Sequence, residues 1–253
     1  MTLLADLTWP EAARLAAAGA LLAVPVGSTE QHGPHLPLST DTDIAVALAM
    51  RLATRRPGVV VAPPVSYGSS GEHAGFAGTL SIGQAAVELV LTELGRSAAE
   101  TFGHLLFVCA HGGNADPARQ AVARLRAESR EVLLWMPAPQ PGPDLPAPDA
   151  HAGRTETALQ LALTPGRVRA GLAEAGNTAP LRGLMPALRA GGVRAVSRNG
   201  VLGDPVGATA AEGSRLLDRL AADLAAAVAA WYPGSGRMGR GAGRAEERAA
   251  DSP

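Results

Sequence analysis

The sequence contains no lysine, so all 22 of its basic residues are arginines. This absence excludes a P-loop, which needs a lysine at the phosphates, and it excludes a Schiff-base lysine or a serine–lysine pair. Cys109 is the only cysteine, so the chain cannot form an internal disulfide framework, which fits a reducing compartment and a cytoplasmic location. Because Cys109 lies inside an apolar run, we expect it to be a small buried hydrophobic residue.

The chain also lacks the features of a protein that binds nucleic acid or a membrane. Its net charge is −1, which gives no excess of positive charge to attract either partner. No uninterrupted apolar run approaches the roughly 20 residues that cross a bilayer. The N-terminal stretch carries Asp6 and Glu11 without a basic segment, unlike a signal peptide. The G-x-S-x-G and H-E-x-x-H motifs are absent too, which disfavours a serine hydrolase and a zincin.

The chain does have a repeated alternation of short apolar runs and helical patterns. Four apolar runs predict buried strands, at 21–26, 59–62, 105–110 and 132–136. A helical pattern follows each of them: at 41–56, at 84–102, from just after residue 114 to about 129, and at 154–163. This alternation predicts an α/β fold with a mostly parallel central sheet and helices on both faces.

Composition predicts one domain with a short tail. Hydrophobic residues make up 47% of the 253 residues, enough for a full core. We expect a single domain over 1–232, with a first helix capped by Thr8 and a long final helix over 208–230. The pattern over 171–198 is irregular and predicts no element. Residues 233–253 are rich in glycine, arginine and alanine without apolar periodicity, so we expect them to be disordered.

A polar motif follows each predicted strand: GSTEQHG, GSSGEHAGFAGT, HGGN and DAHAGRTE. In a parallel sheet, ligands bind beyond the carboxyl ends of the strands. Four such loops at one edge are stronger evidence for a site than any one of them alone.

The stretch 24–43, VPVGSTEQHGPHLPLSTDTD, holds three candidate metal ligands. Glu30 and His32 are two apart, so in an extended loop both side chains can face one metal. Asp41 stands at the start of the next helix, where it could bridge two metals or cap the helix, and with Glu30 and His32 just upstream we expect ligation. We interpret Asp43 as a first-turn helix residue.

Three later residues could complete the site. His111 follows a buried strand and precedes two glycines, so we expect a fourth ligand rather than a polar strand-end turn. Asn114 either orients that turn or caps the next helix. His151 suits proton transfer, because its reference pKa is near 6.5. Glu156 suits a second metal or a general base, with a capping-box glutamate as the alternative.

We assign three residues of the neighbouring loops to substrate binding. His73 lies in the glycine-rich loop 68–78, where a structural role is the alternative, and Ser70 and Gly112 are assigned with it. Of the other histidines, we expect His35 beside the site rather than on a metal, and we give His104 no function.

Together the motifs PVGSTEQHGPHLPLSTDTD, GEHAGFAGTLS, HGGN and HAGRTET resemble the creatininase (creatinine amidohydrolase) family in order and spacing, over residues 24–157. The resemblance implies a three-layer α/β/α fold, one or two divalent metals and hydrolysis of unusual amides. It implies that Glu30, His32, Asp41 and His111 are metal ligands, with Asp41 bridging. His151 then matches the catalytic histidine, and Glu156 matches a carboxylate beside it.

The sequence departs from creatininase at two places. Creatininase has a glutamate ligand two residues after the third-motif histidine, where this chain has Gly113, so Glu156 is expected to serve the second metal. Creatininase also has a tryptophan shortly before its catalytic histidine, whereas Trp9, Trp135 and Trp231 are the only tryptophans here. The second departure disfavours creatinine as the substrate and predicts a more open pocket.

A closer resemblance, over about 21–231, is to the subfamily of mycofactocin precursor peptide peptidases, through SYGSSGEHAGFAGTLSIG, AGNTAPLRGLMPALRAGGVRAVS and NGVLGDPVGATAAEG. It implies a peptidase that releases the modified C-terminal Val-Tyr piece of a precursor peptide, using a metal-activated water and His151 as the proton donor to the leaving nitrogen. A Glu/His/Asp set accepts Zn²⁺, Fe²⁺ or Mn²⁺. Since members of the family commonly form multimers, we expect a homo-oligomer.

Two other functions remain open. One is an amidohydrolase of a small cyclic amide or a formamide. The other is a non-catalytic metal-binding protein, which the presence of His151 and Glu156 beside the ligand set disfavours.

Overall fold

The computed structural model describes residues 1–138 and 149–233, and its centre is a sheet of five parallel strands. The strands are β1 Thr2–Leu3, β2 Leu21–Val26, β3 Val59–Val61, β4 His104–Cys109 and β5 Val132–Trp135. Their spatial order is β1-β3-β2-β4-β5, so β2 lies in the middle and pairs in register along its whole length with β4. The order reverses on the two sides of β2, and such a point is where an open parallel sheet binds ligands.

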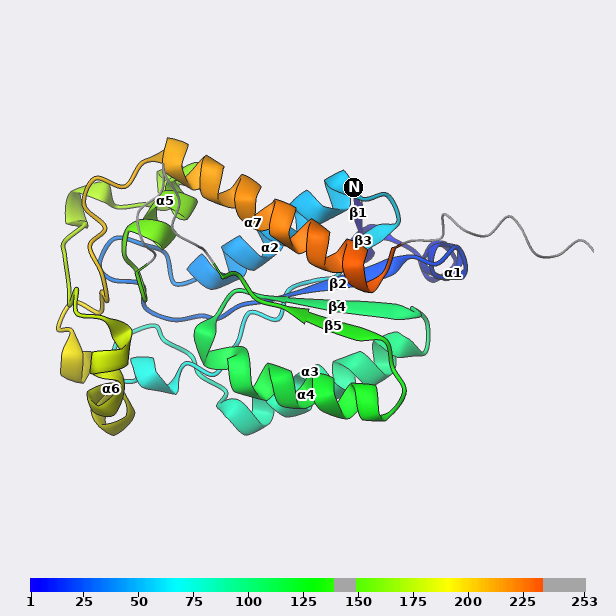
Figure 1. The fold of residues 1–253 in the computed structure, drawn as a ribbon, viewed down its shortest axis with the longest axis horizontal. Helices are drawn as coiled ribbons and strands as arrows, with labels where there is room; N and C mark the ends of the chain where they lie inside the picture. The colour runs from blue at the N-terminus through cyan, green and yellow to red at the C-terminus, as the bar shows by residue number, and fades with distance from the viewer. Residues whose placement is uncertain (139–148, 234–253) are drawn as a thin grey trace, which may run out of the picture.

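Helices cover both faces of the sheet and so make three layers (Figure 1). The α-helices are α1 Trp9–Ala17, α2 Thr40–Arg55, α3 Gln84–Ala99, α4 Ala115–Ala127, α5 Arg154–Leu163, α6 Leu181–Val196 and α7 Ala210–Trp231. Short 3-10 turns lie between them: η1 Leu4–Asp6, η2 Gly71–His73, η3 Gly112–Asn114, η4 Pro165–Arg167 and η5 Ala170–Leu172. Helices α2, α5 and α7 lie on one face, and α3 and α4 lie on the other.

The two cores follow from the alternation of side chains along each strand. In β4, Leu106 and Val108 pack toward the α2, α5 and α7 layer, whereas Leu105 and Phe107 pack toward the α3 and α4 layer. Every residue of β2 is buried, as expected of a strand covered on both faces. Since apolar burial contributes roughly 25 cal/mol per Å², the two cores on this doubly covered sheet stabilise the domain.

The predicted α/β fold is confirmed, and the predicted elements match the observed ones to within a few residues. The structure corrects two points. Thr2–Leu3 forms an edge strand beside β3 that the sequence analysis did not predict. The stretch 171–198, for which no element was expected, contains helix α6. The predicted tail, apart from Pro233, lies outside the described residues, and so do residues 139–148, which precede His151.

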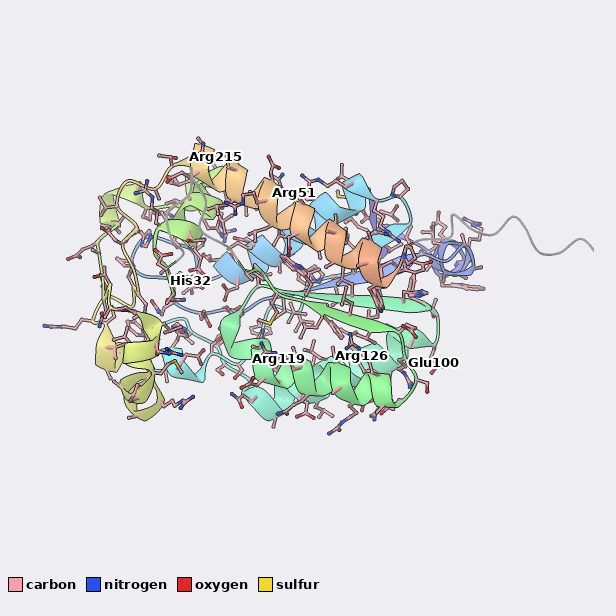
Figure 2. All side chains as sticks on the ribbon, in the orientation of Figure 1. His32, Arg51, Glu100, Arg119, Arg126 and Arg215 are labelled. Carbon is pink, nitrogen blue, oxygen red and sulfur yellow. The ribbon has the colours of Figure 1, made fainter. Side chains whose placement is uncertain are left out.

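The carboxyl ends of β2, β3 and β4 meet at one edge, and their loops meet the turn that holds His151. Figure 2 shows His32 at this edge, inside the molecule, whereas labelled arginines such as Arg51 and Arg119 lie on the outer faces of helices. No helix of the described ranges is both long enough and apolar enough to span a lipid bilayer.

Candidate metal centre

One group of possible ligands combines the loops after β2 and β4. Glu30, Asp41 and His111 each place a ligand atom within 4.8 Å of the others. His111 Nδ1 lies 3.0 Å from Asp41 Oδ2, and His111 Nε2 lies 3.3 Å from Glu30 Oε2. All three side chains are buried, which is costly for charges unless they are paired or bind a cation.

A second group shares Asp41. His32, Asp41 and Glu156 also bring one atom each within 4.8 Å of one another. His32 Nε2 lies 3.3 Å from Asp41 Oδ1 and 3.7 Å from Glu156 Oε2. The two oxygens of Asp41 therefore face different histidines, His32 and His111, from its place in the first turn of α2.

Backbone carbonyls fix the orientation of both histidine rings. His32 Nδ1 donates to the carbonyl of Glu30 at 3.1 Å, which leaves Nε2 facing Asp41 and Glu156. His111 Nε2 donates to the carbonyl of Ser69 at 2.9 Å, which leaves Nδ1 facing Asp41. A histidine held by a backbone carbonyl through one nitrogen and directed into the site through the other has the arrangement that ligating histidines usually have.

The electrostatics indicate a place for positive charge. Burial, and then the neighbouring Asp41 carboxylate, raise the pKa of Glu30 to about 8. Burial also raises the pKa of Glu156 to about 7. Burial disfavours charged His32 and His111, yet the surrounding carboxylates outweigh it and raise each pKa to about 10. The same imidazoles hold the pKa of Asp41 well below its ordinary value despite its burial.

The donor set fits a divalent transition metal. Glu30 Oε2 is buried and accepts no hydrogen bond from any described residue. The candidate ligands around it are carboxylates and imidazoles, and such a mixture of metal ligands suits Zn²⁺, Fe²⁺ or Mn²⁺.

His151 forms a third group of possible ligands with Glu30 and His32, and His73 lies beside Glu30. The backbone of His151 is held by a two-way bridge to Leu202, and its Nδ1 lies 3.9 Å from Glu30 Oε1. Burial, and then the charge of His32, keep the pKa of His151 well below its ordinary value. His73 Nε2 lies 3.3 Å from Glu30 Oε1, and burial lowers its pKa to about 3.

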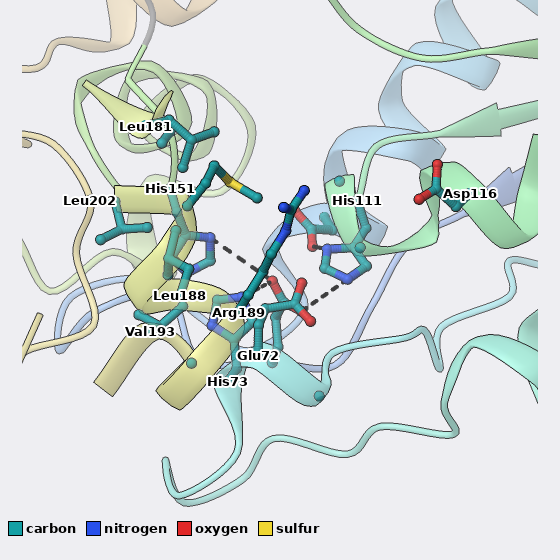
Figure 3. Close-up of a pocket in the computed structure, with 18 of the residues that line it drawn as sticks. Glu72, His73, His111, Asp116, His151, Leu181, Leu188, Arg189, Val193 and Leu202 are labelled. Atoms are coloured by element: carbon teal, nitrogen blue, oxygen red, sulfur yellow. Dashed lines mark ion pairs between the residues drawn. The ribbon is translucent and has the colours of Figure 1, made fainter. Parts of the chain in front are cut away.

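A cavity of about 630 Å³ opens onto this cluster. The polar wall includes Glu30, Asp41, His73, His111, His151 and Glu156. The facing wall is formed by α6, which contributes Leu181, Met185, Leu188, Arg189, Gly192 and Val193. Figure 3 shows the Arg189 side chain extending into the cavity between His151 and His111. Among the described residues, its guanidinium has no ion-pair or hydrogen-bond partner.

Other candidates take places outside the ligand groups. Asp43 pairs with Arg167 at 2.9 Å, as expected for a first-turn helix residue. His35 is buried and its Nε2 lies 2.8 Å from Thr157 Oγ1. Gly112 lines the cavity, whereas Ser70, assigned to substrate binding, is buried behind His111 because the loop turns its hydroxyl to within 3.5 Å of His111 Nε2.

Three further assignments are settled by the contacts. Asn114 makes no capping bond to α4; its amide joins Ser69 N at 2.8 Å to the carbonyl of Gly27 at 2.9 Å, so it orients the turn. Cys109 is buried as expected, and burial raises its thiol pKa to about 12. His104 stacks on Tyr232 with ring centroids 3.7 Å apart, away from the site.

The sequence analysis missed residues that hold the ligands. Ser28 Oγ donates to Asp41 Oδ2 at 2.7 Å, and Gln31 contacts both His73 and His151. Glu156 Oε2 accepts from the backbone nitrogen of Ala152 at 2.6 Å and lies 3.7 Å from His32 Nε2, and α5 has no capping box at Gly153. Gln31 lies between Glu30 and His32 in the sequence, but no pattern there indicates that it contacts His73 and His151.

Comparison with known proteins agrees with this geometry. Residues 5–228 match the family described as creatinine amidohydrolase. The chain belongs to this family. It is a metal-dependent hydrolase that acts on C–N bonds. The resemblance expected from the motifs is therefore confirmed.

Two curated relatives that match most of the chain carry the same name. A mycofactocin precursor peptide peptidase from Mycobacterium ulcerans (strain Agy99) is 47% identical over 239 residues, covering 91% of this chain and 89% of that one. One from Mycolicibacterium smegmatis (strain ATCC 700084 / mc(2)155) is 50% identical over 218 residues, covering 84% and 86%.

Solved structures of creatininase share the fold. One crystal structure of creatinine amidohydrolase superposes with a TM-score of 0.77 at 25% identity, covering 92% of this chain and 99% of that chain. Other creatininase structures are described with manganese and with zinc. Structures of this family are thus described with divalent metals, and this chain gathers carboxylates and histidines that could hold such a metal.

Proposed function

We propose that this protein is a metal-dependent peptidase that releases a modified C-terminal Val-Tyr piece from a mycofactocin precursor peptide. The observation that carries the proposal is the pair of ligand groups sharing Asp41 at the floor of an open cavity. The substrate follows from relatives of that name, which are 47% and 50% identical over most of the chain.

We assign two metal sites to these groups. Glu30, Asp41 and His111 would hold one cation, and His32, Asp41 and Glu156 would hold the other, with Asp41 between them. A divalent cation bound there polarises a carbonyl and lowers the pKa of water from its bulk value toward about 7. We propose Zn²⁺ or Fe²⁺, with Mn²⁺ as a further metal that these donors accept.

The residues of the chain supply the proton transfer and hold the substrate. His151 faces the cluster through Nδ1, which would take a proton from the attacking water and pass it to the leaving nitrogen. His73 and Gly112, on the cavity wall, would lie beside the substrate. The α6 wall places apolar side chains and one arginine opposite the cluster, which suits a peptide better than a small ring.

We also propose that residues 1–232 form one domain that works as a cytoplasmic homo-oligomer. Leu89, Val90 and Leu94 leave apolar surface exposed on α3, which supports a contact between copies. Light scattering of the purified protein tests the oligomeric state, and a monomer would contradict it.

The test is to incubate the metal-loaded enzyme with the modified precursor peptide and, separately, with small cyclic amides and formamides. Mass spectrometry should find the C-terminal piece from the peptide and no turnover of the small amides. Turnover of the small amides alone would replace the peptidase with an amidohydrolase. Metal binding without turnover of either would indicate a non-catalytic protein.

A further inference from the structure

Gln31 stands between Glu30 and His32, and its side chain is buried among four polar groups. Gln31 Nε2 lies 2.8 Å from His73 Nδ1, 3.0 Å from His151 Nε2 and 3.1 Å from the carbonyl of Gly200. Gln31 Oε1 lies 2.9 Å from the backbone nitrogen of Gly33. One carboxamide therefore connects two cavity histidines to two backbone groups.

The two backbone groups decide which way the amide faces. The N–H of Gly33 can only donate, so it must meet the amide oxygen of Gln31. The carbonyl of Gly200 can only accept, so it must meet the amide nitrogen. In a flipped amide, the NH₂ group of Gln31 would face the N–H of Gly33, and its oxygen would face the carbonyl of Gly200.

This orientation fixes the tautomer of His73. The Gln31 amide nitrogen carries two hydrogens, one for the Gly200 carbonyl and one for His73 Nδ1. His73 Nδ1 must then be the bare, accepting nitrogen, and the ring hydrogen sits on Nε2. His73 Nε2 lies 3.3 Å from Glu30 Oε1, so that hydrogen points at a carboxylate assigned to a metal.

The backbone of the same residue fixes His151. His151 Nε2 lies 2.9 Å from the Gln31 carbonyl, and the amide of Gln31 has no hydrogen left for it. His151 Nε2 therefore donates to that carbonyl, and Nδ1 is left bare toward Glu30. Only glycine fits at position 200, because its φ is +81° and the Cβ of any other residue would lie 2.0 Å from Gln31 Oε1.

We propose that the Gln31 carboxamide is a positioning group that locks His73 in its Nε2–H tautomer and thereby orients the Glu30 carboxylate for its metal. The Gln31 backbone carbonyl holds His151 in the same tautomer, so His151 exchanges its working proton at Nδ1. The parts concerning the metal and the working proton of His151 rest on the proposed function, whereas the tautomer of His73 does not.

The test uses two side-chain variants of similar length. Gln31→Glu keeps an acceptor for Gly33 and removes the hydrogen that His73 Nδ1 accepts. Gln31→Met removes both donor and acceptor. Long-range ¹H–¹⁵N spectra of the histidine rings, assigned with His73→Gln and His151→Gln, report each tautomer in the metal-free protein without substrate. Metal affinity is measured on the same samples by calorimetry.

In the wild-type protein we expect both rings in the Nε2–H form. In Gln31→Glu, His73 should change to the Nδ1–H form, and in Gln31→Met it should become a mixture. His151 should stay unchanged in both, because its acceptor is a backbone carbonyl, so it serves as the control within the same spectrum. Since groups that orient ligands typically change metal affinity about 10- to 100-fold, a loss of that size is expected at one of two sites.

A wild-type His73 in the Nδ1–H form would overturn the proposal, and so would variants with unaltered His73 signals. If Gln31→Glu does not fold, the uncharged Gln31→Met decides by the same criteria. A failure to cleave the precursor peptide bears on the proposed function alone, since these spectra contain no substrate.

Discussion

Removal of the Asn114 side chain should loosen the metal centre without touching any ligand. Its amide oxygen accepts from Ser69 N, and its amide nitrogen donates to the Gly27 carbonyl. These two bonds tie the loops after β2 and β3 to the turn that carries His111. In Asn114→Ala both backbone groups would remain buried without a partner.

The expected cost follows from those two groups. A buried backbone group left unpaired costs about 1–3 kcal/mol, so the variant should lose about 2–6 kcal/mol of stability. For a domain of this size, about 2–4 °C of melting temperature accompany each kcal/mol, which predicts a fall of roughly 5–20 °C. Urea denaturation gives the free energy, and calorimetry gives the melting temperature.

Asp116→Ala is the matched control, because Asp116 lies two residues further on and its one ion pair within the described ranges is with the exposed Arg119. An exposed pair of this kind is worth about 0–1 kcal/mol, so the control should melt within a few degrees of the wild type. If Asn114→Ala were as stable as Asp116→Ala, the amide would not hold the loops together. Metal affinity should fall about tenfold in Asn114→Ala, since the Ser69 carbonyl orients His111.

Three further outcomes are expected. Asp41→Asn should lose metal at both sites and lose activity with it, whereas the control Asp43→Asn should keep its full metal content. Elemental analysis measures the metal in both variants. A metal-free Asp41→Asn that is still active would contradict the assignment of Asp41 as the shared ligand. Metal binding should release protons and become stronger as pH rises, because the pKa of His32 is raised to about 10 in the metal-free protein and this proton must leave before His32 can bind a metal. Calorimetry in buffers of different ionisation enthalpy measures the number of protons released. Binding without proton release would refute the prediction. Arg189→Ala should raise KM for the peptide about tenfold at unchanged metal content, while Arg182→Ala on the same helix, outside the cavity, should match the wild type; equal KM values would remove Arg189 from substrate binding.

The convergence of the ligands was predictable because strand ends are strongly determined. The apolar runs at β2 and β4 are buried on both faces, so their direction and register leave little freedom. A polar motif directly after such a strand must reach the common edge of the sheet. Asp41 was predictable for a related reason, since it lies in the first turn of a helix whose pattern is clear from the sequence.

Helix α6 was not predicted, although Leu181, Met185 and Leu188 have helical spacing. Pro186 lies inside the helix, and Gly192 breaks its geometry with φ +69°. Proline and glycine have low helix propensity, so their presence argued against a helix in this stretch. Among its residues only Val193 is buried, because the apolar face lines the cavity rather than a core.

The role of Gln31 could not be derived from spacing at all. Its partners lie 42, 120 and 169 residues away along the chain, at His73, His151 and Gly200. A glutamine in a polar loop has no periodic signature, and its contacts exist only after β2, β3 and the 199–203 turn have assembled. Long-range polar contacts of this kind decide proton positions, yet they leave no local trace in the sequence.

The metal site and the substrate wall therefore depend on different parts of the fold. The ligands stand at the ends of strands whose removal from water stabilises the whole domain. Helix α6 packs against the turn η2, its Val193 is buried, and its Arg194 donates to the carbonyl of Gly75. Substitutions on α6 can change which amide is bound while the strands keep the ligands in place. This separation of ligands from substrate wall explains how the chain keeps the creatininase fold at 25% identity. The wall can differ at the same time, since this chain lacks a tryptophan shortly before His151.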